Sequence, residues 1–284
     1  MTRALSIMEC SSIHHRKAEC FPFIFINMIK VNDLTKYFGN LCAVDHVSLH
    51  VENGIFGLLG PNGAGKSTIV RILSTLLKPT GGNATICGYD LAREPKKVRE
   101  VISYVPQEMA LDIKLTGREN ALLYAKLYGI ADRSRKVDEV LELMELTARS
   151  DDLVRTYSGG MRRRLELAQA LVHEPEVLFL DEPTLGLDVA ARTKIWRHIL
   201  SLQEQGIVIF MTTHYMEEAD EYCDTVAIID HGRIVALDTP ERLKSEMKGE
   251  KTSLNDVFID RVTTPEEESV FDGYKFRTML RRRR

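Results

Sequence analysis

Residues 60–67 read Gly-Pro-Asn-Gly-Ala-Gly-Lys-Ser and match the pattern G-x-x-x-x-G-K-[ST] in full. An apolar run precedes them at residues 54–59, and a helical pattern follows from residue 66 to about residue 76. A strand, a glycine-rich loop and a helix in this order bring backbone N–H groups and a positive helix end around phosphate oxygens. Lys66 adds a charge for the β and γ phosphates, and the Ser67 hydroxyl is a ligand for Mg²⁺. This motif predicts a phosphate-binding loop at the end of a buried parallel strand.

Strand and helix patterns alternate along the rest of the chain. Strand-like segments fall at residues 29–31, 43–51, 83–87, 101–105, 177–180, 207–212, 226–229 and 234–237, with a hairpin turn at 230–233. Helical periodicity covers residues 116–147 as two amphipathic helices, then 159–172, a segment from about 188, and 215–222. The alternation predicts an α/β fold that carries a helical insert.

The two ends of the chain differ from this pattern. The apolar run at residues 21–29 follows a basic stretch at 14–17. It is shorter than the roughly 20 residues of a membrane span, and no small-residue cleavage site follows it. We expect a poorly ordered leader at 1–27, a domain at 28–240 with its helical insert at about 110–173, a C-terminal helical extension at 241–260 and a mobile tail at 261–284.

Composition excludes several classes of protein. The net charge of −3 is not that of a nucleic-acid-binding domain, which usually carries a basic patch. The 5 cysteines are widely spaced and form no CxxC pair. A disulfide framework and a zinc site are therefore not expected.

Two further segments complement the phosphate-binding loop. The apolar strand at residues 177–180 runs into Asp181 and Glu182. Because a parallel strand ends at the ligand crevice, Asp181 is expected to reach Mg²⁺ and Glu182 to hold the attacking water as general base. Ser158, Gly159 and Gly160 open a helix, and their hydroxyl and bare amides form a second anion site at its N-terminus.

These segments resemble the ATP-binding cassette ATPases, whose signature is usually written LSGGQ. Tyr157 and Met161 stand here for the leucine and the glutamine, while the Ser-Gly-Gly core is intact. The YSGGM form followed by arginines is similar to the daunorubicin-type drug exporter branch. Residues 254–258, Leu-Asn-Asp-Val-Phe, resemble a short C-terminal motif of the same branch.

The resemblance assigns further positions. Gln107 matches the family's Q-loop, Asp188 the D-loop and His214 the switch histidine. Phe38 lies where an aromatic ring normally stacks on adenine, with Tyr37 as the alternative. The resemblance covers about residues 29–240 and, weakly, to 260.

The resemblance implies a P-loop NTPase-type parallel sheet core, an antiparallel β subdomain and an inserted α-helical subdomain, with ATP and Mg²⁺ as cofactors. The implied catalytic residues are Lys66, Gln107, Glu182 and His214. The implied metal contacts are Ser67, Gln107 and Asp181. The implied nucleotide contacts are Phe38, Gly60, Pro61, Asn62, Gly63, Ala64, Gly65, Lys66, Ser67, Thr68, Ser158, Gly159, Gly160 and Asp188.

The resemblance also implies the function. Two such domains, as a homodimer or a heterodimer, are expected to close face to face on ATP and to drive substrate export through a separate membrane permease. The chain would then lie in the cytoplasm, on the inner face of the cell membrane. The alternative is a non-transport ATPase of this family that acts on DNA or ribosomes, but members of that kind carry a long coiled coil or two cassettes. Neither is found here, and no nucleic-acid partner is expected. The transported substrate is not encoded in these motifs.

Overall fold

The computed structural model describes residues 28–247 and 252–262, and the expected leader and nearly all of the expected tail lie outside these ranges. The strands are β1 (Ile29–Phe38), β2 (Leu41–Val51), β3 (Ile55–Leu59), β4 (Gly81–Ile86), β5 (Tyr89–Asp90), β6 (Ile102–Val105), β7 (Val177–Asp181), β8 (Val208–Thr213), β9 (Thr225–Asp230) and β10 (Arg233–Asp238). The α-helices are α1 (Lys66–Leu73), α2 (Pro95–Val101), α3 (Gly117–Leu127), α4 (Arg133–Leu143), α5 (Gly159–Leu171), α6 (Val189–Glu204), α7 (Met216–Tyr222), α8 (Pro240–Ser245) and α9 (Leu254–Val262).

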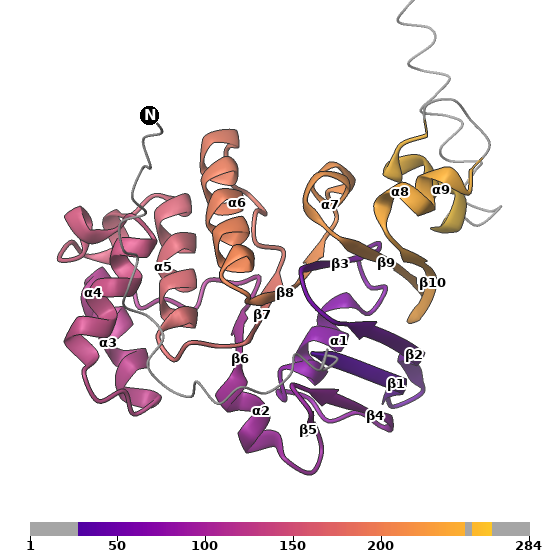
Figure 1. The fold of residues 1–284 in the computed structure, drawn as a ribbon, viewed down its shortest axis with the longest axis horizontal. Helices are drawn as coiled ribbons and strands as arrows, with labels where there is room; N and C mark the ends of the chain where they lie inside the picture. The colour runs from indigo at the N-terminus through magenta and orange to yellow at the C-terminus, as the bar shows by residue number, and fades with distance from the viewer. Residues whose placement is uncertain (1–27, 248–251, 263–284) are drawn as a thin grey trace, which may run out of the picture.

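The strands form two sheets of different kinds. The larger sheet has the order β10-β9-β3-β8-β7-β6, and β9, β3, β8, β7 and β6 run parallel, with β10 antiparallel at one edge. The smaller sheet has the order β2-β1-β4-β5 and is antiparallel throughout. Figure 1 shows α3, α4 and α5 grouped at one end of the molecule and the antiparallel sheet at the other, with the parallel sheet between them. The α/β class predicted from the sequence, including the antiparallel and helical parts, is confirmed.

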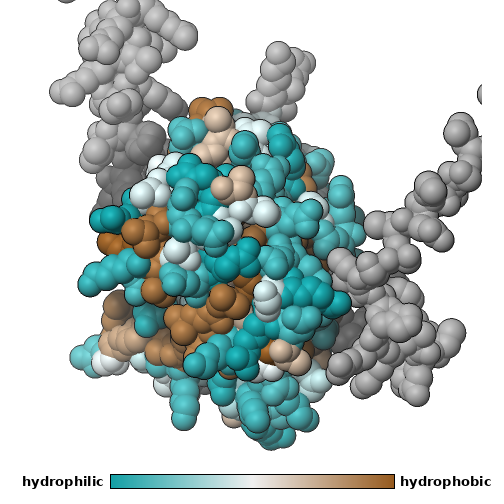
Figure 2. All heavy atoms as spheres, turned by 90° about the vertical axis from the view of Figure 1, so that its left-hand side faces the viewer, coloured by the Kyte–Doolittle hydropathy of each residue, from teal (hydrophilic) through white to brown (hydrophobic). Residues whose placement is uncertain are grey.

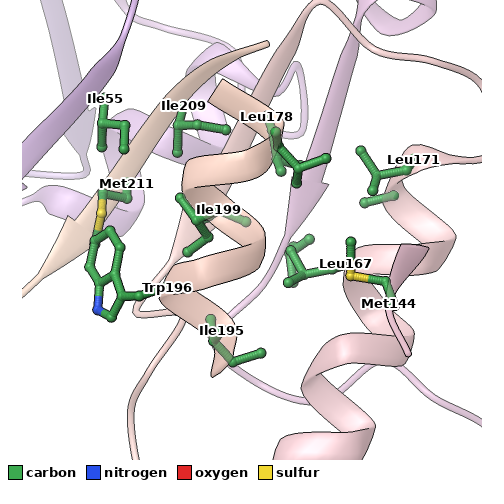
Figure 3. Close-up of a cluster of buried hydrophobic side chains, with 14 of the residues drawn as sticks. Ile55, Met144, Leu167, Leu171, Leu178, Ile195, Trp196, Ile199, Ile209 and Met211 are labelled. Carbon is green, nitrogen blue, oxygen red and sulfur yellow. The ribbon is translucent and has the colours of Figure 1, made fainter. Parts of the chain in front are cut away.

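Both faces of the parallel sheet are buried, because successive side chains of a strand point to opposite faces. In β7, Leu178 and Leu180 belong to one apolar cluster, whereas Val177 and Phe179 belong to the other. The first cluster also receives side chains from the helices that follow residue 110, and the second receives those of α1 and the antiparallel sheet. Figure 3 shows Trp196 of α6 lying beside the strand side chains of the first cluster.

Local sequence explains where the helices begin. Thr116 and Glu119 form a reciprocal capping box at the start of α3, and Asp132 caps α4 through the backbone N–H of Arg135. Ser158 accepts the backbone N–H of Met161 and so caps α5. These caps satisfy N–H groups that have no partner inside the helix.

The structure differs from the predicted elements at a few places. The helix after the phosphate-binding loop ends at Leu73 rather than near residue 76, because Thr75 is left-handed at φ 63° and the next two N–H groups return to the Arg71 carbonyl. The sequence pattern predicts neither α2 nor β5. Val98 is the one buried residue of α2, and β5 is a two-residue strand, so neither produces a periodic signal. At the other end of the chain, α9 runs to Val262, past residue 261 where the sequence pattern predicts that order is lost.

Phe210 holds the second cluster together. It is fully buried, and its ring centroid lies 4.9 Å from that of Phe56 and 5.5 Å from that of Phe179.

Phe210→Ala should lower the free energy of unfolding by about 3–5 kcal/mol, because it leaves a cavity between two rings. Urea unfolding followed by circular dichroism measures the loss. Leu127→Ala on α3, where the side chain is 72% exposed, is the matched control and should cost less than about 0.5 kcal/mol. Equal losses for the two variants would contradict this packing.

Candidate functional site

The ends of four neighbouring parallel strands gather the predicted site residues at one edge of the sheet. The loop at residues 60–65 follows β3, His214 follows β8, Asp181 ends β7 and Gln107 follows β6. These strands are adjacent in the order β3-β8-β7-β6. Ligands of open parallel sheets bind outside the carboxyl ends of the strands, and this edge is such a place.

The loop after β3 curls around the side chain of Lys66. The Lys66 ammonium donates hydrogen bonds to the carbonyl of Gly60 at 2.6 Å and that of Pro61 at 3.0 Å. Burial lowers the pKa of Lys66, while the carboxylates of Glu182 and Asp181 act in the opposite direction. The Lys66 ammonium is thus a buried cation that the loop's own carbonyls hold in place. It can exchange these acceptors for the oxygens of an anion. Gly63, Ala64 and Gly65 complete the turn, and Ser67 and Thr68 lie in the first turn of α1.

Two glycines let the loop approach neighbouring backbone. A Cβ on Gly60 would lie 2.4 Å from the carbonyl oxygen of Ile229. A Cβ on Gly65 would lie 2.4 Å from that of Ala43, and Gly65 also adopts φ 108°, a value that other residues rarely take. Gly60 and Gly65 are therefore required by packing, whereas a Cβ on Gly63 would meet nothing within 4 Å.

Asp181 has the oxygen neighbours expected of a magnesium site. Its Oδ1 accepts the hydroxyl of Thr212 at 2.5 Å and lies 3.4 Å from the Ser67 hydroxyl. Its Oδ2 lies 3.5 Å from the hydroxyl of Tyr104, whose pKa is raised to about 12 by burial and by the neighbouring carboxylate. Mg²⁺ in phosphate sites uses one or two protein oxygens and takes its remaining ligands from phosphate and water. Ser67 and Asp181 fit that donor set.

Glu182 is held between two other predicted residues. Gln107 Nε2 donates to Glu182 Oε2 at 3.2 Å, and His214 Nδ1 lies 3.4 Å from Glu182 Oε1. Glu182 has φ 49°, a left-handed conformation that costs a non-glycine residue about 1–3 kcal/mol. Its N–H donates to both the carbonyl and the hydroxyl of Thr212, at 3.1 Å each, and these bonds stabilise the strained turn. Strain of this kind gathers at functional sites.

These side chains border an open cleft of about 500 Å³, lined by Gly60, Pro61, Asn62, Gln107, Glu182, Leu185, His214, Met216, Asn255 and Phe258. Asn255 and Phe258 come from α9 and were not among the predicted site residues. The only sequence signal was the short motif at residues 254–258. Helix α9 packs against α7, which begins two residues after His214, and this contact brings it to the cleft.

The second predicted anion site lies apart from this cleft. None of Ser158, Gly159 and Gly160 lines it. A Cβ on Gly159 would contact Leu187, and one on Gly160 would lie 2.8 Å from the Cβ of Ala191, so these glycines pack on the start of α6. Asp188 caps α6 by accepting the N–H of Ala191 at 2.9 Å. Within one chain, the structure does not bring the two halves of the predicted site together.

The predicted adenine platform also lies outside the cleft lining. Phe38 ends β1 and is 48% exposed, with the Lys36 ammonium 5.1 Å from its ring centroid. Tyr37, the alternative, is 45% exposed. Both rings are available to a ligand, and the structure does not choose between them.

One positioning residue was missed by the sequence analysis. Arg163 of α5 is buried and donates to the carbonyls of Pro106, Asp181 and Pro183 at 2.8, 3.1 and 3.0 Å. It also pairs with Glu166 at 3.0 Å. The guanidinium thus ties the helical part of the chain to the backbone just before Gln107 and on either side of Glu182. The arginine run at residues 162–164 gave no sign of which arginine turns inward.

Comparison with known proteins agrees with this geometry. A family model described as ABC transporter matches residues 44–185. The daunorubicin resistance ATP-binding protein DrrA3 of Streptomyces coeruleorubidus is 46% identical over 226 residues, which cover 78% of this chain and 72% of that relative. The linearmycin resistance ATP-binding protein LnrL of Bacillus subtilis is 39% identical over 241 residues, covering 82% and 78%.

Solved structures give the same relationship. The ATP-binding subunit of an ABC transporter superimposes with a TM-score of 0.74 at 28% identity, covering 82% of this chain and 98% of that one. A dimeric ATP-binding cassette in a post-hydrolysis state with ADP and Pi superimposes with a TM-score of 0.68 at 27% identity, covering 75% and 98%.

The close approach at Gly65 has a measurable consequence. Gly65→Ala should weaken MgATP binding by at least about tenfold, because the added Cβ displaces the loop from the Ala43 carbonyl and tilts the start of α1. Gly129→Ala is the matched control. Gly129 also has a positive φ, of 69°, but a Cβ there meets nothing within 4 Å. Fluorescence titration with a nucleotide analogue gives the affinities. Equal affinities for the two variants would show that the close approach is unimportant for binding.

Proposed function

The chain belongs to the ATP-binding cassette (ABC) transporter family as an ATP-hydrolysing subunit, and we propose that it powers export through a separate membrane permease. The observation that carries the mechanism is the meeting of residues 60–67, Gln107, Asp181, Glu182 and His214 at one sheet edge. The alternative, a non-transport ATPase acting on DNA or ribosomes, is not favoured, since the named relatives are resistance ATP-binding proteins.

The proposal assigns the triphosphate to the loop after β3. Backbone N–H groups of residues 62–67 and the N-terminus of α1 would hold the phosphate oxygens. Lys66 would exchange its two carbonyl acceptors for β and γ phosphate oxygens. Ser67 and Asp181 would hold Mg²⁺, which supplies charge neutralisation for the phosphates when it is bound. Phe38 or Tyr37 would stack on the adenine.

In the proposed hydrolysis, Glu182 accepts a proton from the water that attacks the γ-phosphorus. The bond from that phosphorus to the bridging oxygen breaks, and ADP and phosphate leave. His214 and Gln107 flank the carboxylate on its two sides. His214 would hold the γ-phosphate, and Gln107 would orient the water and approach Mg²⁺. Both roles are supported by the contacts that the two side chains make to Glu182.

The proposal includes a second cassette. Ser158, Gly159 and Gly160 open a helix N-terminus that does not line the cleft of the same chain, so they would serve the nucleotide held by a second chain. ATP would then lie between two helix N-termini, and its hydrolysis would remove the bridge. A homodimer and a heterodimer both satisfy this geometry. The solved cassette with ADP and Pi that resembles this chain is a dimer.

The permease would dock beside the helical part of the chain. In the part of the chain that the structure describes, no helix is long and apolar enough to cross a membrane. Figure 2 shows apolar residues among polar ones on the end of the molecule where α3 and α4 lie. Large exposed apolar side chains of this region are Met109, Ile113, Leu123, Leu127 and Tyr128. A surface of this kind suits a protein partner, and it adjoins the segment that carries Gln107.

The names of the relatives suggest the transported class. They are resistance proteins for daunorubicin and linearmycin, so we propose that the substrate is an amphipathic drug-like molecule moved outward. With its permease, the chain would lie at the inner face of the cell membrane.

The role of Glu182 is tested by Glu182→Gln. Glutamine keeps the shape and the contact with Gln107 but cannot take a proton, so the hydrolysis rate should fall by about 10² to 10⁴-fold. ATP affinity should change by less than about threefold, and a dimer should accumulate with MgATP. An ATPase assay and size-exclusion chromatography measure both effects. Glu204→Gln, on an exposed residue at the end of α6, is the control. Normal hydrolysis in Glu182→Gln would place the general base elsewhere.

The second cassette is tested by Ser158→Arg. The long side chain fills the space that the partner's γ-phosphate would occupy, so the protein should bind ATP as a monomer, lose hydrolysis and show no dimer on the same column. Ser134→Arg, an exposed serine on α4, adds the same charge away from that surface. Full activity in Ser158→Arg would exclude the sandwich of two chains.

A further inference from the structure

A polar cluster, buried at Thr184 and Glu218 and half-buried at its other members, connects the segment after Glu182 with the segment after His214. It consists of Thr184, Arg192, Tyr215 and Glu218. Thr184 lies two residues beyond Glu182, and Arg192 lies in the first turn of α6, just after the D-loop at residues 185–188. Tyr215 and Glu218 lie at the start of α7, directly after His214. None of the four lines the nucleotide cleft.

Glu218 is the centre of this cluster. It is 5% exposed, and Thr184, at 1% exposed, donates its hydroxyl to Glu218 Oε2 at 2.7 Å. A carboxylate at this depth is stable only if it is paired and hydrogen-bonded. The bond fixes the start of α7 to the turn that carries Glu182.

Arg192 extends the cluster to the switch histidine. Its Nε lies 3.4 Å from Glu218 Oε1, and its guanidinium lies 4.5 Å from the ring centroid of Tyr215. The Tyr215 ring in turn lies 4.2 Å from that of His214. A guanidinium at this distance is attracted to the face of the ring. These contacts form a continuous connection from Arg192 of α6 to the His214 ring.

The link between Arg192 and Glu218 is loose. Arg192 Nε and Glu218 Oε1 are both buried, face each other at ion-pair distance, and make no hydrogen bond. Buried polar atoms without a hydrogen bond are costly. A small shift of α6 toward α7 would give both atoms their bond.

The D-loop beside Arg192 is exposed and partly apolar. Leu185 is 40% exposed and Val189 is 79% exposed. Leu187 packs against Gly159, so this surface is continuous with the helix N-terminus that the proposed function assigns to the second chain. A second chain that closes on that surface would press on the segment that carries Arg192.

We propose that Glu218 is a positioning residue which, through Arg192 and Tyr215, makes the placement of His214 and Glu182 depend on the docking of a second copy at the D-loop. The inference rests on the proposed roles of His214 and Glu182 and adds a route by which closure of the dimer sets them. Hydrolysis is then fast only when the second copy is in place. Glu218 itself touches no nucleotide and no reacting atom.

The test is a double-mutant cycle of the full chain with ATP. In Glu218→Gln the amide oxygen can still accept from Thr184, while the NH₂ group faces Arg192 and breaks the ion pair. Because a misplacement of about 1 Å can cost roughly 100-fold in rate, we expect kcat to fall by about 10- to 100-fold with KM for ATP within about twofold. Glu217→Gln, an exposed neighbour in the same turn, is the control and should match the wild type. Added to His214→Ala, Glu218→Gln should slow hydrolysis no further, because the variant keeps the Thr184 bond to the turn that carries Glu182 and so acts through that histidine.

Two results would overturn the inference: a wild-type rate for Glu218→Gln, or a double variant slower than His214→Ala by the full factor of Glu218→Gln. The failures are distinguishable. If His214→Ala is slow but Glu218→Gln is normal, this inference alone fails. If His214→Ala hydrolyses ATP normally, the proposed role of His214 fails as well. Should Glu218→Gln not fold, Arg192→Met replaces it, with the exposed Arg197→Met on the same helix as control. The same split of kcat from KM is then expected, and its absence overturns the inference.

Discussion

Parallel pairing of β3, β8, β7 and β6 is the constraint on which the rest of the structure depends. Each strand contributes a buried run and then, at its carboxyl end, one part of the site. Because neighbouring strands in a sheet lie about 4.8 Å apart, four segments that are far apart in the chain come within reach of one nucleotide. Helices and the antiparallel sheet cover the two faces, and this is why the strands are mostly apolar before their polar carboxyl ends.

Polar residues in the interior fix these strand ends with respect to one another. Thr212 at the end of β8 binds the side chain of Asp181 and the backbone of Glu182 at the end of β7. Arg163 joins the ends of β6 and β7 to α5. Buried hydrogen bonds of this kind add little net stability but are costly to break. Their consequence is a defined position for each of the polar groups at these strand ends.

One chain carries the parts of the proposed site on two separate surfaces. One chain presents a loop for phosphates and a carboxylate for water, and on a different surface it presents a capped helix N-terminus with bare glycines. If the site is completed by a second chain as proposed, neither half works alone and hydrolysis responds to assembly. The cluster around Glu218 lies between the two surfaces and is suited to carry that response. Helix α9 adds Asn255 and Phe258 to the lining of the cleft, so the short motif at residues 254–258 borders the candidate site.

Much of this protein could be derived from local sequence. The phosphate-binding loop, the acidic pair after β7 and the alternation of strands and helices are short-range patterns whose physics is local: glycine for tight backbone, apolar runs for buried strands, and serine for a helix cap. The covering of the two faces of the parallel sheet, the packing of α9 beside the cleft and the inward orientation of Arg163 are different. Each of them depends on which elements become neighbours. A run of arginines reads the same whether a side chain points to water or into the core. Arg163 is the arginine that turns inward because it donates to the carbonyls of Pro106, Asp181 and Pro183. Contacts between residues that are distant in the chain cannot be recognised in the sequence pattern of either segment alone.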